Sequence, residues 1–276
     1  MNTTLGQELL EKLCPECGEA EVSTPILVVV AHPDDEFIGA GARFSHWSAL
    51  SFVHVTDGAP RDMRDARESG FVSREAYAEA RRNEFHKALG LVGAKPQAEH
   101  MLGFVDQESS NDLPRLTQRL LEIIRELKPE AIVTHPYEGG HPDHDATAFA
   151  VGAAVRLMEQ QHENVPSIIE MTSYHNGPYG MVAGEFLPVA NCEPIVRVLS
   201  TPECALKRRL YSCFASQQRT LRWFPIESES FRFAPQYDFT RPPHDGKLFY
   251  EQFKWGTDGA RWRQLAARAS KTLRIA

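Results

Sequence analysis

Residues 26–36 of the chain read ILVVVAHPDDE, and this stretch decides the fold because an apolar run passes directly into a polar turn. The run, which begins at Pro25 and ends at Ala31, is rich in β-branched residues and apolar throughout, as a parallel strand buried on both faces must be. Similar strand-like runs recur at 51–56, 100–104, 131–134 and 167–174. Stretches with helical periodicity lie between them, at 73–91, 113–127 and 147–158. This alternation predicts an α/β fold, with a Rossmann-like, mostly parallel sheet and helices on both faces.

Two clusters of histidine and carboxylate residues follow two of the predicted strands. The first, HPDDE, occupies 32–36, and the second, HPYEGGHPDHD, occupies 135–145 directly after the strand at 131–134. Ligands of open α/β sheets bind beyond the carboxyl ends of the strands, where both clusters should emerge. Charged and imidazole groups crowded at one edge are costly to bury unless they are paired or bound to a metal. Together the two clusters therefore predict a metal site.

The spacing within the clusters favours a catalytic metal site over a structural one. A turn stiffened by Pro33 can aim His32 and Asp35 at one point, and one histidine of the second cluster would add a second imidazole. Such a set leaves coordination positions open for water and substrate. Non-haem Fe(II) oxygenases use the same ligand types. Their HxD pattern lies on antiparallel sheets, whereas this chain has His-x-x-Asp between a strand and a helix, so an oxygenase is the less favoured alternative.

At these motifs the sequence resembles the PIG-L/LmbE-like zinc-dependent de-N-acetylases, which remove acyl groups from N-acetylglucosamine-type substrates. The resemblance rests on AHPDDE at 31–36 and HPDH at 141–144, with support from TDG at 56–58. A predicted helix with Arg81-x-x-Glu84 running into Leu89-Gly90 is also similar to the family. The resemblance covers residues 25–160 well and 207–217 faintly.

The resemblance implies a role for each matching residue. The metal ligands would be His32, Asp35 and His144. Asp34 would be the general base, His141 the protonated electrophile or general acid, and Asp143 the group that orients His141.

The resemblance also implies contacts with the substrate. Arg81 and Asp106 match family positions that contact sugar hydroxyls. Some members place a tyrosine where this chain has Gly139, and Tyr137 is the nearby candidate for that role.

The function implied is removal of an N-acetyl (acyl) group from an N-acetylglucosamine-containing small molecule or glycoconjugate. The expected cofactor is Zn²⁺, and another divalent transition metal such as Fe²⁺ would suit the same ligands. A metal would activate water, Asp34 would take its proton, and His141 would assist the carbonyl and the leaving amine. The alternative is a catalytically silent sugar-binding protein on the same fold, which the absence of a base at position 34 would favour.

The composition and the apolar runs of the chain argue against nucleic acid and membranes as partners. The net charge of −7 argues against nucleic acid. No apolar run approaches the roughly 20 residues that span a bilayer, and residues 1–21 lack the features of a signal peptide, so we expect a cytoplasmic protein without membrane insertion. Five cysteines do not suggest a disulfide scaffold, and we expect no chemistry from the pair Cys14 and Cys17.

The expected organisation has three parts. Residues 1–24 form an N-terminal extension, 25–200 the Rossmann-like catalytic core, and 201–276 a C-terminal helix and wrapping segment of the same domain. This last part is expected to be irregular, and residues 211–276 hold half of the chain's aromatic side chains. These rings have three interpretations: they wrap the core, they line a wall of the substrate pocket, or they form the interface of a homo-oligomer.

Overall fold

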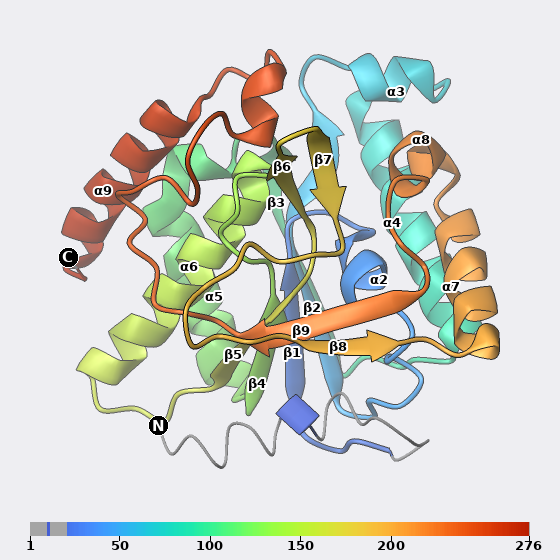
Figure 1. Ribbon diagram of the computed structural model, residues 1–276, viewed down its shortest axis with the longest axis horizontal. Coiled ribbons are helices and arrows are strands. Elements are labelled where there is room, and N and C mark those ends of the chain that lie inside the picture. The colour runs from blue at the N-terminus through green and yellow to red at the C-terminus, as the bar shows by residue number, and fades with distance from the viewer. Residues whose placement is uncertain (1–9, 12–20, 276) are drawn as a thin grey trace.

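The computed structural model describes residues 10–11 and 21–275, which contain a seven-stranded sheet and a two-stranded hairpin (Figure 1). The main sheet has the strand order β3-β2-β1-β4-β5-β9-β8. Its strands are β1 (Ile26–Val30), β2 (Leu50–Pro60), β3 (Ala98–Asp106), β4 (Ala131–Thr134), β5 (Ser167–Met171), β8 (Ile195–Val198) and β9 (Ser228–Phe233). Cys14, Cys17 and most of the predicted N-terminal extension lie outside the described residues, so the expectations for them stay predictions.

The five strands from β3 to β5 are parallel and confirm the predicted Rossmann-like core. β1 lies between β2 and β4, so that Val29 is paired with both Val53 and Thr134. From β1 the chain builds the sheet outward through β2 and β3, and then returns to the other side of β1 with β4. The strand order therefore reverses between β1 and β4. Ligands of such sheets bind at this reversal, beyond the carboxyl ends of the two strands.

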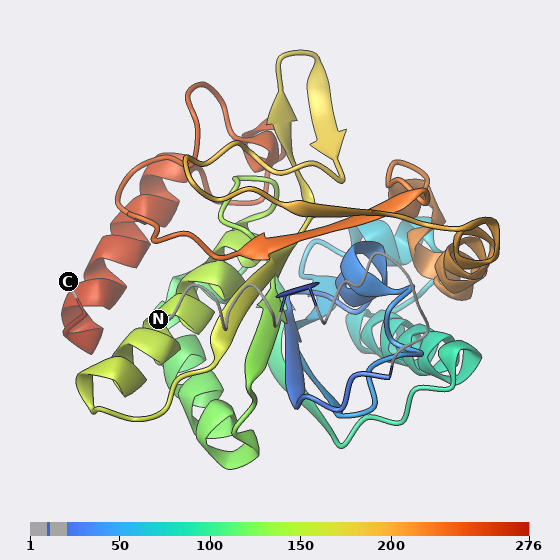
Figure 2. The same cartoon turned by 60° about the horizontal axis from the view of Figure 1, so that its bottom comes forward.

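Two antiparallel strands extend the sheet beyond β5. β9 pairs with β5, and β8 pairs with β9 at the edge. The predicted strand at 167–174 ends early, at Met171, and Thr172 N donates to Ser230 O on β9 at 3.1 Å. The chain then enters the hairpin of β6 (Tyr174–Gly177) and β7 (Gly180–Ala183). This hairpin stands away from the main sheet in Figure 2.

Helices cover both faces of the sheet, as the sequence predicts (Figure 1). Side chains of β1 alternate between two cores: Val28 and Val30 pack on the side of α2, α4 and α7, and Leu27 and Val29 on the side of α5, α6 and α9. The helices are α2 (Asp35–Ala40), α3 (Arg64–Glu68), α4 (Arg74–Val92), α5 (Leu113–Leu127), α6 (Pro142–Gln160), α7 (Thr201–Cys213), α8 (Gln218–Leu221) and α9 (Gly259–Leu273). Short 3-10 helices lie at Ser109–Asp112, Ala215–Gln217 and Phe249–Gln252. Among the described helices, none has the length and apolar content needed to cross a bilayer.

The helix that carries the second cluster begins earlier than the predicted residue 147. α6 starts at Pro142, a residue well suited to a first helical turn, and its N-cap is His141. The ring Nδ1 of His141 accepts a hydrogen bond from Asp143 N at 3.2 Å. α2 likewise begins inside the first cluster, at Asp35. Both clusters therefore lie at helix N-termini, where the helix dipole favours the carboxylates of Asp35 and Asp143.

The aromatic C-terminal quarter contains regular elements, β9 and α9 among them, where the sequence predicts irregular structure. Asp258 caps α9 by accepting a hydrogen bond from Arg261 N at 2.7 Å. Trp262 is fully buried, and its indole nitrogen donates to Pro142 O at 3.1 Å. Part of this quarter thus wraps the core and supports the start of α6.

A buried cluster of charges joins β9 to β5 and to the loop after β4. Arg232 Nε lies 2.8 Å from Glu170 Oε2, and Arg232 Nη2 lies 3.3 Å from Glu138 Oε1. The hydroxyl of Tyr237 donates to Glu170 Oε1 at 2.7 Å. Burial raises the pKa of Glu138 to about 8 and the pKa of Glu170 to about 7, although Arg232 opposes both shifts. The cluster fixes the antiparallel strands to the loop that leads to His141.

Replacement of Arg232 by methionine should strongly destabilise the fold. At a pH above about 8, where both carboxyls are ionised, it would leave two buried charges without their cation, a loss of about 3–5 kcal/mol in the free energy of unfolding. Urea denaturation followed by circular dichroism measures this loss. Arg119, whose guanidinium is exposed and 3.7 Å from Glu122, provides the matched control, and Arg119→Met should cost less than about 0.5 kcal/mol. Equal losses in the two variants would contradict the structural role of Arg232.

The stability of the protein should also respond to Glu138 as pH changes. A carboxyl whose pKa is higher in the folded chain than in the unfolded chain contributes stability below the unfolded value near 4.5 and loses it as pH rises through the folded value. Glu138 and Glu170 should therefore lower the thermal midpoint between about pH 5 and pH 8. Glu138→Gln should flatten this decline, whereas Glu122→Gln, at an exposed site, should leave it unchanged. An unaltered slope in Glu138→Gln would refute the assignment.

Candidate metal centre and active site

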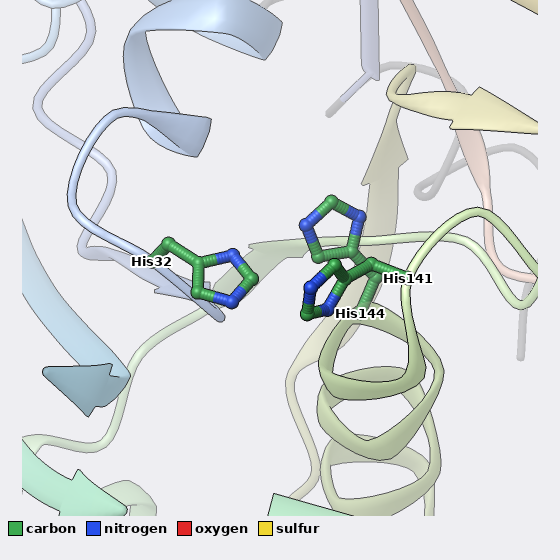
Figure 3. Close-up of side chains that lie close together, drawn as sticks. All are labelled: His32, His141 and His144. Atoms are coloured by element: carbon green, nitrogen blue, oxygen red, sulfur yellow. The ribbon is translucent and has the colours of Figure 1, made fainter. Parts of the chain in front are cut away.

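The two predicted clusters meet at the reversal point between β1 and β4. Figure 3 shows the ring of His32, from the loop after β1, facing the rings of His141 and His144 at the start of α6. One ring nitrogen from each of these three residues lies within 4.8 Å of the others, and all three side chains are buried. The strand ends thus bring together residues more than a hundred positions apart.

The three predicted metal ligands are linked through Asp35. Its Oδ2 lies 3.2 Å from His32 Nδ1, and its Oδ1 lies 3.2 Å from His144 Nε2. The backbone N–H of His32 also donates to Oδ2 at 2.8 Å, which orients the carboxylate. Burial acts to raise the pKa of Asp35, but His144 and His135 outweigh it and hold the pKa well below its ordinary value. Asp35 is therefore ionised, as a ligand must be.

The cluster offers more donors than the predicted three. Among the described residues, three sets have donor atoms within 4.8 Å of one another: His32 with His141 and His144; His32 with Asp106, His141 and Asp143; and Asp35 with His135 and His144. No single set contains all three predicted ligands: His32 and His144 share the first set, and Asp35 and His144 share the third. Asp35 connects the sets because it turns one oxygen toward His32 and the other toward His144. Imidazole and carboxylate donors without thiolates suit zinc and other first-row divalent metals. The residues present therefore fit the expected cofactor.

Asp34 holds a backbone conformation that residues other than glycine rarely adopt, with φ 141° and ψ −30°. Such strain costs on the order of 1–3 kcal/mol and persists only where neighbouring contacts enforce it. Here the backbone N–H of Asp34 donates to Glu36 Oε2 at 3.2 Å, and the same oxygen lies 3.2 Å from His54 Nε2. Burial raises the pKa of Asp34 to about 8, although the neighbouring Arg81 acts to lower it.

Arg81, expected to contact sugar hydroxyls, is buried against Asp34. Its Nη2 lies 3.0 Å from Asp34 Oδ2 and donates to Pro33 O at 3.0 Å, while Nη1 donates to Gly58 O at 2.7 Å. A Cβ on Gly58 would lie 2.5 Å from Nη1, and the residue has φ +65°, so the TDG motif needs glycine there. The guanidinium thus fixes the orientation of the Asp34 carboxylate.

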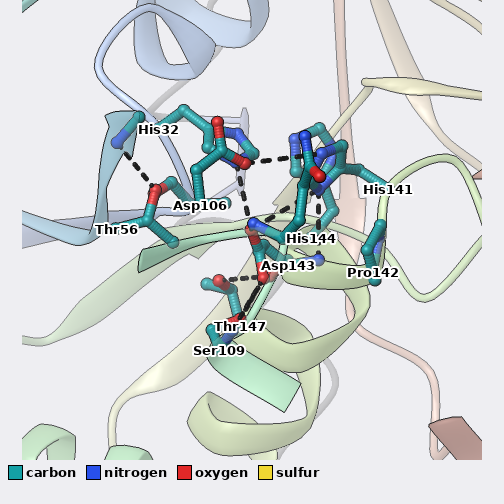
Figure 4. A network of polar contacts seen from close by, with 12 residues as sticks. His32, Thr56, Asp106, Ser109, His141, Pro142, Asp143, His144 and Thr147 are labelled. Atoms are coloured by element: carbon teal, nitrogen blue, oxygen red, sulfur yellow. Dashed lines mark hydrogen bonds and ion pairs between the residues drawn. The ribbon is translucent and has the colours of Figure 1, made fainter. Parts of the chain in front are cut away.

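Asp143 and Asp106 enclose His32 from the other side (Figure 4). Asp143 accepts hydrogen bonds from Ser109 N at 3.0 Å and from Gln107 N and Ser109 Oγ at 2.5 Å each. Its Oδ2 lies 3.8 Å from Nδ1 of His141, so the predicted orienting contact is not formed as a hydrogen bond in this structure. Asp106, at the end of β3, lies 3.1 Å from His32 Nε2.

The protonation state of His141 differs from the sequence expectation. Burial and the neighbouring His32 hold the pKa of His141 well below its ordinary value. The structure therefore favours a neutral imidazole, whereas the resemblance implies a protonated one. A neutral ring still carries one N–H donor.

The structure does not bring Tyr137 to the cluster. Its ring stacks on Trp262 with centroids 5.2 Å apart, and its hydroxyl donates to Arg241 O at 2.9 Å. Aromatic packing in the core, which the spacing of residues in the motif does not reveal, decides this orientation.

Other residues in the site carry weaker sequence signals. His135 stacks on His144 with centroids 4.0 Å apart, and its Nε2 accepts a hydrogen bond from Ala31 N at 3.0 Å. Ser173 Oγ lies 3.1 Å from His144 Nδ1. Trp255 lies 4.7 Å from His141 between ring centroids. Ser173 and Trp255 come from segments without a recognisable motif, and only their proximity in space identifies them.

Comparisons with known proteins agree with this geometry. The family model described as PIG-L, GlcNAc-PI de-N-acetylase, matches residues 27–155. A probable N-acetyl-alpha-D-glucosaminyl L-malate deacetylase 2 from Bacillus cereus is 30% identical over 159 residues, which cover 56% of this chain and 71% of that protein.

Solved structures share the fold at lower identity. A deacetylase from the teicoplanin biosynthesis pathway is similar with a TM-score of 0.59 and 18% identity, over 78% of this chain and 99% of that one. The 4-carboxy-2-hydroxymuconate hydratase GalB of Pseudomonas putida is similar with a TM-score of 0.52 and 17% identity, over 78% and 98%. The fold is thus common to different reactions. The identity and coverage of the Bacillus relative, together with the family match over both motifs, show that the chain belongs to the PIG-L family of GlcNAc-PI de-N-acetylases.

Proposed function

We propose that the chain is a metal-dependent N-deacetylase that hydrolyses the acetamide of an N-acetylglucosamine-containing small molecule or glycoconjugate. The observation that carries this proposal is the pair of adjacent carboxylates after β1. Asp35 is turned toward His32 and His144, while Asp34 is held by Arg81 at 3.0 Å. One carboxylate can then bind a metal while its neighbour handles a proton, a division of roles that amide hydrolysis by water requires.

The residues that would hold the metal are His32, Asp35 and His144. Zn²⁺ is the ion we propose, and Fe²⁺ would suit the same donors. A divalent ion there would polarise the amide carbonyl and make a water molecule more acidic. Ser173, 3.1 Å from His144 Nδ1, fixes the orientation of that ring and leaves Nε2 turned toward Asp35.

Asp34 is the proposed general base. Arg81 holds Oδ2 of this carboxylate, so we assign Oδ1 as the atom that takes a proton from water. The strained backbone of Asp34 and its burial both cost free energy. A sugar-binding protein without catalysis would gain nothing from that cost, and this favours the enzyme over the silent alternative.

His141 is the proposed partner of the carbonyl and of the leaving amine. Its ring follows Gly140 at the N-cap of α6, beside His32 and His144. A ring N–H can donate a hydrogen bond to the developing oxyanion. To deliver a proton to the amine, the ring must first be protonated, and the proton that Asp34 takes from water can supply it. Asp106, with Oδ1 3.7 Å from His141 Nε2, is the proposed sugar-contacting carboxylate and also lies close enough to influence this ring.

Replacement of Asp34 by alanine tests the function and the base together. The wild-type protein should release free amine and acetate from members of a panel of N-acetylated sugars. Asp34→Ala should retain its metal, measured by inductively coupled plasma mass spectrometry, and lose roughly 10²–10⁴-fold in rate because the proton acceptor is gone. Glu79→Ala, at an exposed position on α4, should behave like wild type. Full activity in Asp34→Ala would rule out the base assignment, and a wild-type protein that releases neither amine nor acetate from any sugar of the panel would contradict the proposed function.

Replacement of Asp35 and Asp106 by alanine identifies the metal ligands. Asp35→Ala should empty the site, because it removes the carboxylate that links His32 to His144. Asp106→Ala should keep the metal, because Asp106 belongs only to the set built on His32, His141 and Asp143. The reverse result, with metal lost from Asp106→Ala and kept by Asp35→Ala, would place the ion in that second set.

A further inference from the structure

Four aromatic side chains form a continuous chain of ring contacts beside the metal centre. We call Tyr174, Phe249, Phe253 and Trp255 the aromatic wall. Tyr174 lies 5.4 Å from the ring of His144, Phe249 follows at 5.4 Å, and Phe253 at 5.5 Å from Phe249.

The far end of the aromatic wall returns to the metal centre. Trp255 stacks on Phe253, with ring centroids 4.5 Å apart and an angle of 15°, and lies 4.7 Å from His141. The rings of His141 and His144 are themselves 5.2 Å apart. The wall therefore begins at one histidine of the second cluster and ends at the other.

The segment that carries the wall is fixed to the loop that carries His141. Phe249 N donates to Gly139 O at 2.9 Å, and Leu248 packs so tightly on Gly139 that a Cβ there would lie 2.7 Å from Leu248 Cδ2. Glu251 closes the segment, because its carboxylate accepts hydrogen bonds from Leu248 N at 3.0 Å and from Gly259 N at 2.8 Å. A wall held in this way can position a ligand relative to His141.

The outer part of the wall presents apolar surface to solvent. Phe253 is 39% exposed and Trp255 is half-buried, whereas their neighbour Tyr250 is fully buried. A large exposed aromatic pair beside a cluster of polar catalytic groups is typical of a ligand-binding surface. Stacked rings of this kind bind the apolar faces of sugars and of aromatic groups.

The position of the wall indicates which part of a substrate it contacts. His141 is the group we assign to the leaving amine, and Trp255 is the member of the wall that touches it. The amine remains on the sugar when the acyl group departs, so the wall lies on the sugar side of the amide. Phe253 stacks on Trp255 and is the most exposed ring of the wall, so it can contact whatever the sugar carries.

We propose that the aromatic wall is a specificity-determining site that binds the amino-sugar portion of the substrate and selects sugars bearing an aromatic or other apolar substituent. This proposal rests on the proposed deacetylase function. Trp255 contacts the sugar nearest the reacting amide, and Phe253 contacts the substituent. A substrate whose substituent is small should gain little from Phe253.

The test compares benzyl and methyl glycosides of N-acetylglucosamine in the metal-loaded protein. Wild type should hydrolyse the benzyl glycoside with a kcat/KM roughly tenfold higher, the value of about one good stacking contact. Phe253→Ala and Trp255→Ala should bring the ratio of the two kcat/KM values to within about twofold, and Trp255→Phe should restore much of it. Trp223→Ala removes another exposed tryptophan, one that lies against Arg222, and should leave the ratio unchanged. Circular dichroism verifies that each variant is folded.

Two outcomes would overturn the proposal: a wild-type ratio near one, or an unchanged ratio in both Phe253→Ala and Trp255→Ala. If wild type hydrolyses neither glycoside, the wall is judged by binding instead, and the panel of N-acetylated sugars decides separately whether the proposed function fails. Isothermal titration with the same two glycosides should then show a preference for the benzyl compound that both wall variants lose. Equal affinity of the two compounds for wild type would reject the wall as an apolar site.

Discussion

The site depends on one topological constraint: β1 and β4 are neighbouring parallel strands whose following helices lie on opposite faces of the sheet. α2 packs on one core and α6 on the other, so the two chains diverge as soon as the strands end. The space between them is filled by the histidines and carboxylates that precede or begin the helices. Because both helices start there, their N-termini also stabilise the carboxylates electrostatically. A sheet without this reversal would hold the same motifs apart.

Burial of so many ionisable groups requires compensation from the rest of the fold. Arg81 reaches from α4 to hold Asp34, and Asp143 is surrounded by donors from the turn at 107–109. A second compensated set, built on Arg232, supports the loop that leads to His141. The parallel core alone therefore does not complete the site. It also needs a helix packed on one face and an antiparallel strand added at the edge.

The sequence predicts well those parts of the molecule that local pattern controls. Buried parallel strands are continuous apolar runs, so β1 and β4 and the polar residues after them can be identified, and with them His32 and Asp35. The sequence predicts the start of α6 too late, because the histidines and carboxylates of 141–145 hide a helical turn. The position of Tyr137 near the motif predicts that it reaches the site, but its orientation is decided by packing on Trp262, more than a hundred residues away. Trp255 and Ser173 lie in segments without a periodic pattern or a motif, so the sequence alone does not indicate that they reach the site.

The contact between Gly139 and Leu248 can form only late in the synthesis of the chain. The loop that carries His141 emerges from the ribosome about a hundred residues before the segment that packs on it. Until Leu248 and Phe249 arrive, Gly139 O lacks its donor and the ring of His141 lacks its aromatic neighbour. The proposed metal ligands all precede residue 145, but contacts that hold the loop and the start of α6 come later in the chain, from Arg232 of β9 and Trp262 of α9. The loop before α6 therefore gains its full set of contacts only when nearly the whole chain has been synthesised.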